Sequence, residues 1–160
     1  MGNKKKQEEK NGDFRQISKN RKAYHDYEVL DTYEVGIELT GTEVKSLRAG
    51  KINLGDGFAV IKNGQVWLQN VHISPFEQGN RFNPETTRQR RLLLHKNQIL
   101  TLQQQTDRQN LTLVPLSVYF KKQWVKIQLG LCRGRKAHDK RHKIADADNK
   151  RRLAALMKHR

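Results

Sequence analysis

Residues 58–71 read FAVIKNGQVWLQNV, and they contain two strands and the turn between them. Phe58–Lys62 and Gln65–Val71 are rich in the β-branched and aromatic residues that favour strands. The dipeptide Asn63-Gly64 separates them, and both of its residues tolerate the positive φ angles that a type I′ turn requires. The stretch therefore predicts a β-hairpin.

Two longer strands are predicted towards the carboxyl end of the chain. Leu111–Phe120 and Trp124–Leu131 are joined by the short polar segment Lys121-Lys122-Gln123. In the second of these strands Val125, Ile127, Leu129 and Leu131 alternate with Trp124, Lys126, Gln128 and Gly130. Tyr33–Thr40 shows the same alternation of apolar and polar residues. A two-residue period indicates a strand with one buried face.

Two short helices and one long loop complete the predicted domain. Thr42–Ala49 has apolar residues three apart and Gly50 to end it, and Thr40 or Thr42 can cap its first turn. Lys96–Gln105 also has apolar residues at helical spacing. Ser74–Arg91 is polar and contains two prolines, so it is predicted to be a loop, and a loop of this length is usually functional or mobile.

These elements predict a mainly β fold. They give five or six strands, mostly antiparallel, with two or three short flanking helices and no βαβ alternation. A small closed or partly closed barrel accommodates them best, because closure removes the exposed edges of a sheet. We expect an oligonucleotide-binding (OB-like) antiparallel barrel over residues 19–132.

Positive charge is concentrated at the two ends of the chain. The net charge is +16, of which residues 133–160 contribute +8 and residues 1–22 contribute +5. The remaining residues, 23–132, are close to neutral at +3. Segregated positive charge attracts polyanions and releases their counterions on binding, so nucleic acid is the leading partner. The alternative is that the basic ends only keep a small protein in solution.

The two ends are predicted to lie outside the barrel. Residues 1–18 have no apolar periodicity and cannot offset the entropy of ordering, so they are predicted to form a disordered basic arm. Residues 133–160 form a basic tail with a weak apolar stripe that includes Leu153, Leu156 and Met157. We expect this tail to be disordered in the free chain and helical on an anionic groove. The alternative is a helix that docks permanently on the barrel.

Catalytic, metal and membrane functions find little support in the sequence. The chain has no glycine-rich phosphate loop, no Gly-x-Ser-x-Gly elbow and no His-Glu-x-x-His. Its six histidines lack metal-ligand spacing, and no cofactor is expected. The single cysteine, Cys132, excludes an internal disulfide and indicates a reducing compartment. No segment approaches a membrane span or a secretory signal. We therefore expect a monomeric, cytoplasmic protein that is not an enzyme.

Two cationic segments are candidates for contact with RNA. Asn20–Tyr27 places cations beside aromatic rings, a composition suited to phosphate contact and base stacking. Alternatively, Tyr24 or Tyr27 plugs one end of the barrel. The second segment comprises Arg88, Arg90 and Arg91, with His95 just beyond it. Together the two segments outline an RNA-binding face on the barrel.

Four ordered blocks of this sequence resemble one protein family. They are residues 20–23 with His25 and Tyr27, residues 36–51 (GIELTGTEVKSLRAGK), residues 90–94 (RRLLL) and residues 139–141 (DKR). From about Asn20 to Met157 the chain is similar to the SsrA-binding proteins, also called small protein B, which are the bacterial partners of transfer-messenger RNA.

The resemblance implies an oligonucleotide-binding barrel that binds the tRNA-like domain of transfer-messenger RNA. The barrel would take the place of the anticodon arm, which this RNA lacks. It also implies that the tail enters the empty messenger channel of a stalled small ribosomal subunit and folds there as a helix. Trans-translation, the rescue and peptide tagging of stalled ribosomes, can then begin. The tail departs from familiar members at Asn149, where a tryptophan is often found.

The resemblance and the charge pattern together define the candidate residues. Those expected to contact RNA are Asn20, Arg21, Lys22, His25, Glu34, Arg90, Arg91, Leu93 and His95. Those expected to contact the ribosome are Arg133, Arg135, Lys136, His138, Asp139, Lys140, Arg141, Lys143, Lys150, Arg151 and Met157. Among them, the resemblance places His25, Glu34, Leu93 and His95 at the RNA-binding face and residues 138–141 at the start of the tail that meets the decoding centre.

Two other functions are alternatives to the hypothesis of an adaptor that brings transfer-messenger RNA to stalled ribosomes. The nearer is a general ribosome-associated or rRNA-binding protein of the same fold with no role in rescue. The more distant is an RNA-processing enzyme that uses His25 with Glu34 and Glu38, two carboxylates on one face of the first strand. Alternate acidic residues on a strand are far more often its solvated face, which argues against the enzyme.

Overall fold

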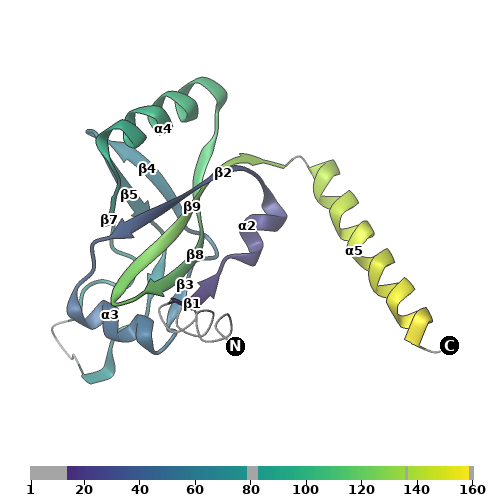
Figure 1. The fold of residues 1–160 in the computed structure, drawn as a ribbon, viewed down its shortest axis with the longest axis horizontal. Coiled ribbons are helices and arrows are strands. Elements are labelled where there is room, and N and C mark those ends of the chain that lie inside the picture. Colours follow the sequence, from purple (N-terminus) through teal and green to yellow (C-terminus); the bar gives the residue numbers. More distant parts are fainter. Residues whose placement is uncertain (1–13, 79–82, 136, 159–160) are drawn as a thin grey trace, which may run out of the picture.

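The computed structural model describes residues 14–78, 83–135 and 137–158, and within the last range it describes the side chains of residues 147–157. The described chain is mainly β, with one seven-stranded antiparallel sheet, one small two-stranded sheet and four helices. Figure 1 shows the strands gathered into one body, with α4 across one end of it and α5 extending away from it.

The predicted hairpin is confirmed. It consists of β4 (Phe58–Lys62) and β5 (Gln65–Gln69), which pair in register from Phe58↔Gln69 to Lys62↔Gln65. Asn63 has a φ of 54° and Gly64 a φ of 72°, as a type I′ turn requires. The second strand ends at Gln69 rather than at Val71, because Asn70 adopts a φ of 60° and turns the chain out of the ladder.

Three long strands form the rest of the framework. They are β2 (Tyr27–Ile37), β8 (Thr112–Lys121) and β9 (Trp124–Gly134). The β8–β9 hairpin predicted from the sequence is confirmed, and β9 pairs on its other side with β2 from Tyr27↔Gly134 to Gly36↔Lys126. The strand predicted at Tyr33–Thr40 corresponds to β2. It starts at Tyr27, earlier than predicted, and it ends at Ile37 because Thr40 caps the following helix.

The order of the seven strands is β1-β8-β4-β5-β7-β2-β9, and β8 also pairs with β9. From β8 the pairing therefore runs through β4, β5, β7, β2 and β9 and returns to β8, with β1 attached to β8 outside this ring. The ring is uneven. Nine residue pairs join β8 to β9, whereas a single pair, Ala59↔Leu113, joins β4 to β8. The small separate sheet pairs β3 (Ile52–Asn53) with β6 (His72–Ile73).

Besides the two short strands of the small sheet, two strands of the large sheet were not predicted. One is β7 (Arg90–Leu93), which occupies the end of the predicted polar loop and pairs with β5 and β2. The other is β1 (Phe14–Lys19), which pairs with β8. The prediction of disorder is therefore wrong for residues 14–18, because the free edge of β8 supplies backbone partners and Ile17 packs against the core. The remainder of the predicted arm, residues 1–13, lies outside the described residues.

The helices follow local signals. α3 (Gly41–Arg48) begins at Thr40, whose side chain accepts from the N–H of Glu43 while the Glu43 carboxylate accepts from the N–H of Thr40. α4 (Lys96–Gln109) is one turn longer than predicted and ends at Asn110, which has a φ of 53°. The short helix α2 (Arg21–Asp26) was not predicted.

The core lies between the strands and under α4. It includes Val35, Val66, Leu68, Leu92, Leu102, Leu113, Ile127 and Leu129, each at most 2% exposed. A second cluster lies beneath α2, where Ala23 packs on Val114, Leu116 and Cys132 with Tyr24 and Tyr27 beside them. Both tyrosines are thus packed against the domain, and so is Cys132. Because β8 supplies both clusters, it is buried along almost its whole length.

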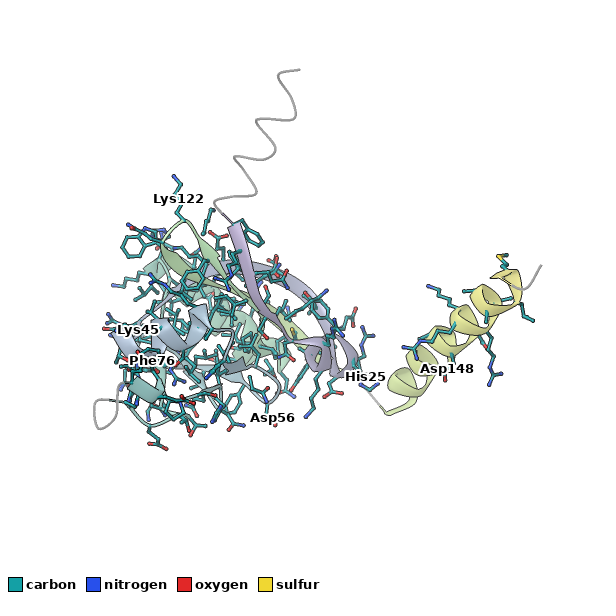
Figure 2. The ribbon with its side chains drawn as sticks, turned by 90° about the horizontal axis from the view of Figure 1, so that it is seen from below. His25, Lys45, Asp56, Phe76, Lys122 and Asp148 are labelled. Carbon is teal, nitrogen blue, oxygen red and sulfur yellow. The ribbon has the colours of Figure 1, made fainter. Side chains whose placement is uncertain are left out.

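The carboxyl segment is a helix, α5 (Ala137–Lys158). The sequence predicts a tail that is disordered in the free chain and helical on an anionic groove, and its disorder in the free chain stays a prediction. The alanines and leucines of residues 145–156 have high helix propensity, which accounts for a helix without a docking surface. Figure 2 shows Asp148 on a helix that stands apart from the body of the domain. Leu153, Leu156 and Met157 are exposed.

Candidate nucleic-acid interface

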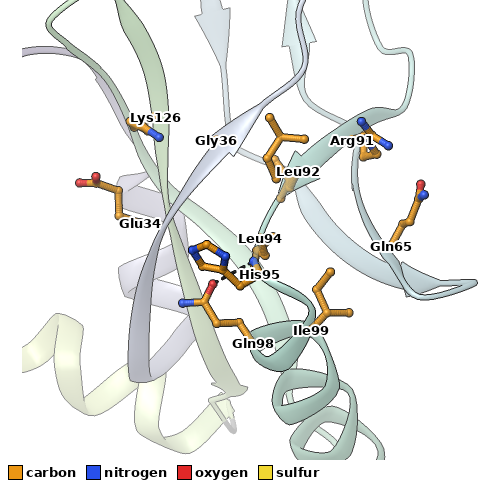
Figure 3. Close-up of a pocket in the computed structure, with 11 residues that line it drawn as sticks. Glu34, Gly36, Gln65, Arg91, Leu92, Leu94, His95, Gln98, Ile99 and Lys126 are labelled. Carbon is orange, nitrogen blue, oxygen red and sulfur yellow. Dashed lines mark hydrogen bonds between the residues drawn. The ribbon is translucent and has the colours of Figure 1, made fainter.

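A groove of about 560 Å³ lies where β2, β5, β7 and β9 meet the first turn of α4. We call it the first groove. Figure 3 shows Glu34 and Lys126 on one side of it, Arg91 and Gln65 on the other, and His95 between them. Leu93 also lines it and is 48% exposed, which leaves a large apolar side chain open to a ligand. The groove thus combines cations with an exposed leucine and a histidine.

Glu34 is the only carboxylate among the residues that line the first groove. It accepts a hydrogen bond of 2.5 Å from the Tyr119 hydroxyl and one of 3.1 Å from Lys121 Nζ. The hydrogen bond from Tyr119 lowers the pKa of Glu34, with Lys121 and Lys126 acting in the same direction against its partial burial. Glu34 is therefore ionised at neutral pH and held in place. A fixed carboxylate can accept from the amino groups of bases.

The opposite wall of the first groove is formed by β7 and α4. Arg91 Nε lies 3.0 Å from Glu38 Oε2, an ion pair at the surface in which that nitrogen makes no hydrogen bond. His95 precedes the first turn of α4 and is exposed. Its backbone N–H donates to Gln98 Oε1 over 3.3 Å, the bond drawn in Figure 3. This wall presents a guanidinium and an imidazole to the groove.

Gly36 makes room for Leu93 in the first groove. The two residues are paired across β2 and β7. A Cβ atom at Gly36 would lie 3.2 Å from Leu93 Cβ and 3.3 Å from its Cδ1, which is tighter than ordinary van der Waals contact. The glycine therefore lets the leucine lie directly on the backbone of β2.

Two predicted contact residues are buried, which corrects the prediction that they contact RNA. Asn20 is 3% exposed. Its side-chain oxygen caps α2 at Ala23, and its amide donates to the carbonyls of Leu54 and Pro115. All its polar groups are satisfied within the protein, so Asn20 joins α2 to two other segments.

Arg90 is 1% exposed and is the larger correction. Its Nε lies 2.6 Å from Glu43 Oε2, and its other nitrogens donate to the carbonyls of Val71, Thr86 and Arg88. Arg88 also pairs with Glu43. Burial lowers the pKa of Arg90 and Glu43 raises it, with a net lowering. These two arginines hold the loop before β7 to α3 and are not a free cationic surface.

The remaining amino-terminal candidates lie on α2, away from the first groove. Arg21 is exposed, and Lys22 Nζ forms a 2.6 Å ion pair with Asp56. His25 Nδ1 lies 2.9 Å from Asp26 Oδ1. Figure 2 shows His25 at the end of the domain nearest to α5. The structure therefore divides the predicted RNA face into two surfaces, of which only the first groove contains Glu34 and His95.

The predicted tail residues lie in two parts of the structure, the end of β9 with the segment after it and the helix α5. Arg133 belongs to β9, and Arg135 is anchored because its N–H donates to the Asp26 carbonyl and its Nε to the Tyr27 carbonyl. Lys136 lies outside the described residues. His138, Asp139, Lys140, Arg141 and Lys143 lie in α5, with side chains outside the described part. Lys150, Arg151 and Met157 are exposed on α5.

Lys126 and Gln65 line the first groove but were missed by sequence reasoning. Lys126 is one of the alternating polar residues of a predicted strand, so its outward direction was foreseeable. Its place beside Gly36 and Glu34 depends on the pairing of β9 with β2, which joins residues about ninety positions apart. Gln65 is carried there by the β5–β7 pairing. No local signal specifies either pairing.

The curled antiparallel sheet and the cationic first groove define a small nucleic-acid-binding β-protein. In the described part of the chain no group of three His, Cys, Asp or Glu residues could hold a metal ion, and no helix is long and apolar enough to cross a membrane. The SmpB protein family model matches residues 17–159. The chain belongs to the SmpB family.

Relatives with known names agree with this assignment. The SsrA-binding protein of Carboxydothermus hydrogenoformans is 54% identical over 144 residues, which cover 90% of this chain and 97% of the relative. The SsrA-binding protein of Streptococcus pneumoniae is 52% identical over 147 residues, covering 92% of this chain and 95% of the relative.

A solved structure is also similar. It is described as "tmRNA-SmpB: a journey to the center of the bacterial ribosome", and its matching chain has 49% sequence identity and a TM-score of 0.64. The match covers 75% of this chain and 85% of that one. The identity is high enough for the likeness to extend beyond the fold alone.

Proposed function

We propose that this protein is a non-enzymatic adaptor that binds the tRNA-like domain of transfer-messenger RNA and delivers it to stalled ribosomes for trans-translation. The observation that supports this most directly is the first groove. There a fixed carboxylate, three basic side chains and an exposed leucine converge from three strands and from the residue that caps α4. Family membership and relatives named as SsrA-binding proteins give the ligand.

The first groove suits a folded RNA better than a small substrate. Lys126 and Arg91 supply positive charge for phosphates, while Leu93 and His95 offer surfaces for a base or a ribose. Glu34 is held by Tyr119 and Lys121, so it acts as an acceptor of fixed position, not as a general acid or base. This assignment leaves no role for Glu34 with Glu38 and His25 in RNA cleavage.

We further propose that the sheet acts as a closed barrel of the oligonucleotide-binding type, with its weakest seam between β4 and β8. The basic helix α5 is then a separate functional part that enters the empty messenger channel and contacts the small ribosomal subunit. Its distance from the body of the domain and its exposed Leu153, Leu156 and Met157 support this role. A protein with this role works as a monomer in the cytoplasm.

The test is the affinity of groove variants for a transcript of the tRNA-like domain. Lys126→Gln and Leu93→Ala should each weaken binding by about tenfold, because each removes a phosphate or base contact of about 1–2 kcal/mol. Lys62→Gln, at the exposed end of β4, is the matched control and should bind like the unchanged protein. Equal affinity of all four proteins would contradict the assignment of the first groove.

A further inference from the structure

A second groove, of about 320 Å³, lies beside the first one on the outward face of β1, β8 and β9. We propose that this second groove is a stacking subsite for an unpaired nucleotide of the same RNA that the first groove binds. The proposal deepens the proposed function and rests on it. Three aromatic residues, Phe14, Tyr24 and Tyr119, line the second groove together with Lys19.

The two grooves lie on one continuous sheet face. Directly paired residues in adjacent antiparallel strands project to the same side. One row of pairs runs Gln16↔Tyr119, Tyr119↔Lys126 and Lys126↔Gly36, from β1 across β8 and β9 to β2. A second row runs Lys19↔Ser117, Ser117↔Gln128 and Gln128↔Glu34. Each row therefore begins in the second groove and ends in the first.

A register shift in β1 keeps Lys19 on this face. Lys19 lies three residues after Gln16, so in a regular strand the two side chains would point to opposite faces. The pairing of β1 with β8 shifts between Gln16 and Ser18, where Ile17 is the extra residue. This bulge places both Gln16 and Lys19 among the residues that line the second groove.

The hydrogen-bonded pair Tyr119 and Glu34 lies between the two grooves. Tyr119 lines the second groove, and its hydroxyl donates to Glu34, which lines the first. Three strand spacings separate β1 from β2, which is about 15 Å across the sheet. A nucleotide adjoining one bound in the first groove therefore has the second groove within reach.

The chemistry of the second groove matches a nucleotide. Phe14 is 49% exposed, and its ring lies 4.8 Å from that of Tyr119 at an interplanar angle of 37°. Lys19 Nζ lies 5.1 Å from the centre of the Tyr24 ring. No Asp or Glu is among the lining residues, so the charge there is positive. Exposed rings beside a cation are the usual platform for an unpaired base and its phosphate.

The experiment compares variants of the full chain for affinity to the tRNA-like-domain transcript. Phe14→Leu keeps an apolar side chain but removes the ring, and it should weaken binding about fivefold or more, the loss expected for one stacked base. Phe14→Trp keeps an aromatic ring at this position, so its affinity should be close to that of the unchanged chain and above that of Phe14→Leu. Lys19→Gln should lower the slope of log affinity against log salt by about one counterion. Leu30→Ala, a similarly exposed residue outside both grooves, is the matched control.

One further measurement, and a comparison with the Lys126→Gln variant, make the outcome decisive. A photoreactive benzoyl-phenylalanine in place of Phe14 should cross-link to unpaired nucleotides of the transcript. If Lys126→Gln weakens binding while Phe14→Leu and Lys19→Gln bind as the unchanged chain does, the second subsite is wrong and the proposed function stands. If the unchanged chain does not bind the transcript, both fall. A cross-link to a ribosomal protein instead of RNA would also overturn the subsite.

Discussion

The Tyr119 hydroxyl donates to Glu34 Oε2 with 2.5 Å between the two oxygens, and it joins two strands that are not neighbours. Tyr119 is on β8 and Glu34 on β2, and β9 lies between those strands. The bond crosses over the sheet face and fixes the one carboxylate of the first groove. The position of Glu34 in this groove therefore depends on a residue outside it.

Tyr119→Phe should release Glu34 and raise its pKa towards the ordinary value of 4.5, because Tyr119 is the main cause of the lowering. The loss of one partly exposed hydrogen bond to a charged group should reduce the free energy of unfolding at pH 7 by about 1 kcal/mol. NMR titration of the Glu34 carboxyl and urea unfolding measure the two effects. Lys121→Gln, which removes an exposed ion pair, should change both less. A Glu34 pKa that stays lowered in Tyr119→Phe would show that the bond is not its cause.

Glu34 should make stability depend on pH in one direction. Its pKa is lowered in the folded chain, so its contribution is complete above the unfolded value of 4.5 and is lost as pH falls through the folded value. The difference in unfolding free energy between the unchanged chain and Glu34→Gln should therefore be constant at neutral pH and shrink below about pH 4. Urea unfolding from pH 3 to 7 measures it. A difference that grows on acidification contradicts the structure.

Glu43→Gln should be among the most destabilising single changes. Burial raises the pKa of Glu43, but hydrogen bonds from Arg88, Thr40 and Arg90 outweigh it and keep the pKa low. Removing this charge leaves Arg90 buried without its partner, at a cost of about 3–5 kcal/mol. Glu38→Gln removes an ion pair at the surface and should cost at most about 1 kcal/mol. Thermal unfolding of both variants is the measurement, and equal losses would refute a buried structural role for Glu43.

Replacing Arg90 should mainly lower stability, whereas replacing the adjacent Arg91 should mainly lower RNA affinity. Arg90→Ala removes the buried partner of Glu43, so it should lower the melting temperature strongly. Where the variant remains folded, it should still bind the tRNA-like domain. Arg91→Ala should leave the melting temperature nearly unchanged but weaken RNA binding, because its side chain is 39% exposed and lines the first groove. Calorimetry and a binding titration on the same preparations separate the two. The reverse assignment would contradict the burial of Arg90.

The elements that the sequence predicted well are those with local signals. The Asn63-Gly64 turn and the capping box at Thr40 each specify their structure through neighbours in the chain. The strands of the large sheet that were missed, β1 and β7, are short, and their pairing partners are distant in sequence. An arginine-rich stretch such as residues 88–91 indicates surface charge, and only the fold shows that Glu43 pairs with Arg88 and Arg90 and leaves Arg91 at the surface.

The candidate site was predicted in part for the same reason. Glu34, Leu93 and His95 came from the family resemblance, and the structure brings all three into the first groove. Asn20 was a candidate because it stands beside Arg21 and Lys22 in the sequence, whereas its side-chain oxygen caps α2 and its amide nitrogen donates to the carbonyls of Leu54 and Pro115. Lys126 required the register of β9 on β2, which no local pattern contains.

The central claim is that the β-domain holds the RNA while α5 acts elsewhere, and a chain that ends after Arg135 tests it. This end point retains the bonds from Arg135 to Asp26 and Tyr27 that close the domain. The truncated chain should bind the tRNA-like domain with nearly the affinity of the full chain, yet support no tagging of peptides on stalled ribosomes. Loss of RNA affinity by an order of magnitude, or tagging at the full rate, would contradict the account.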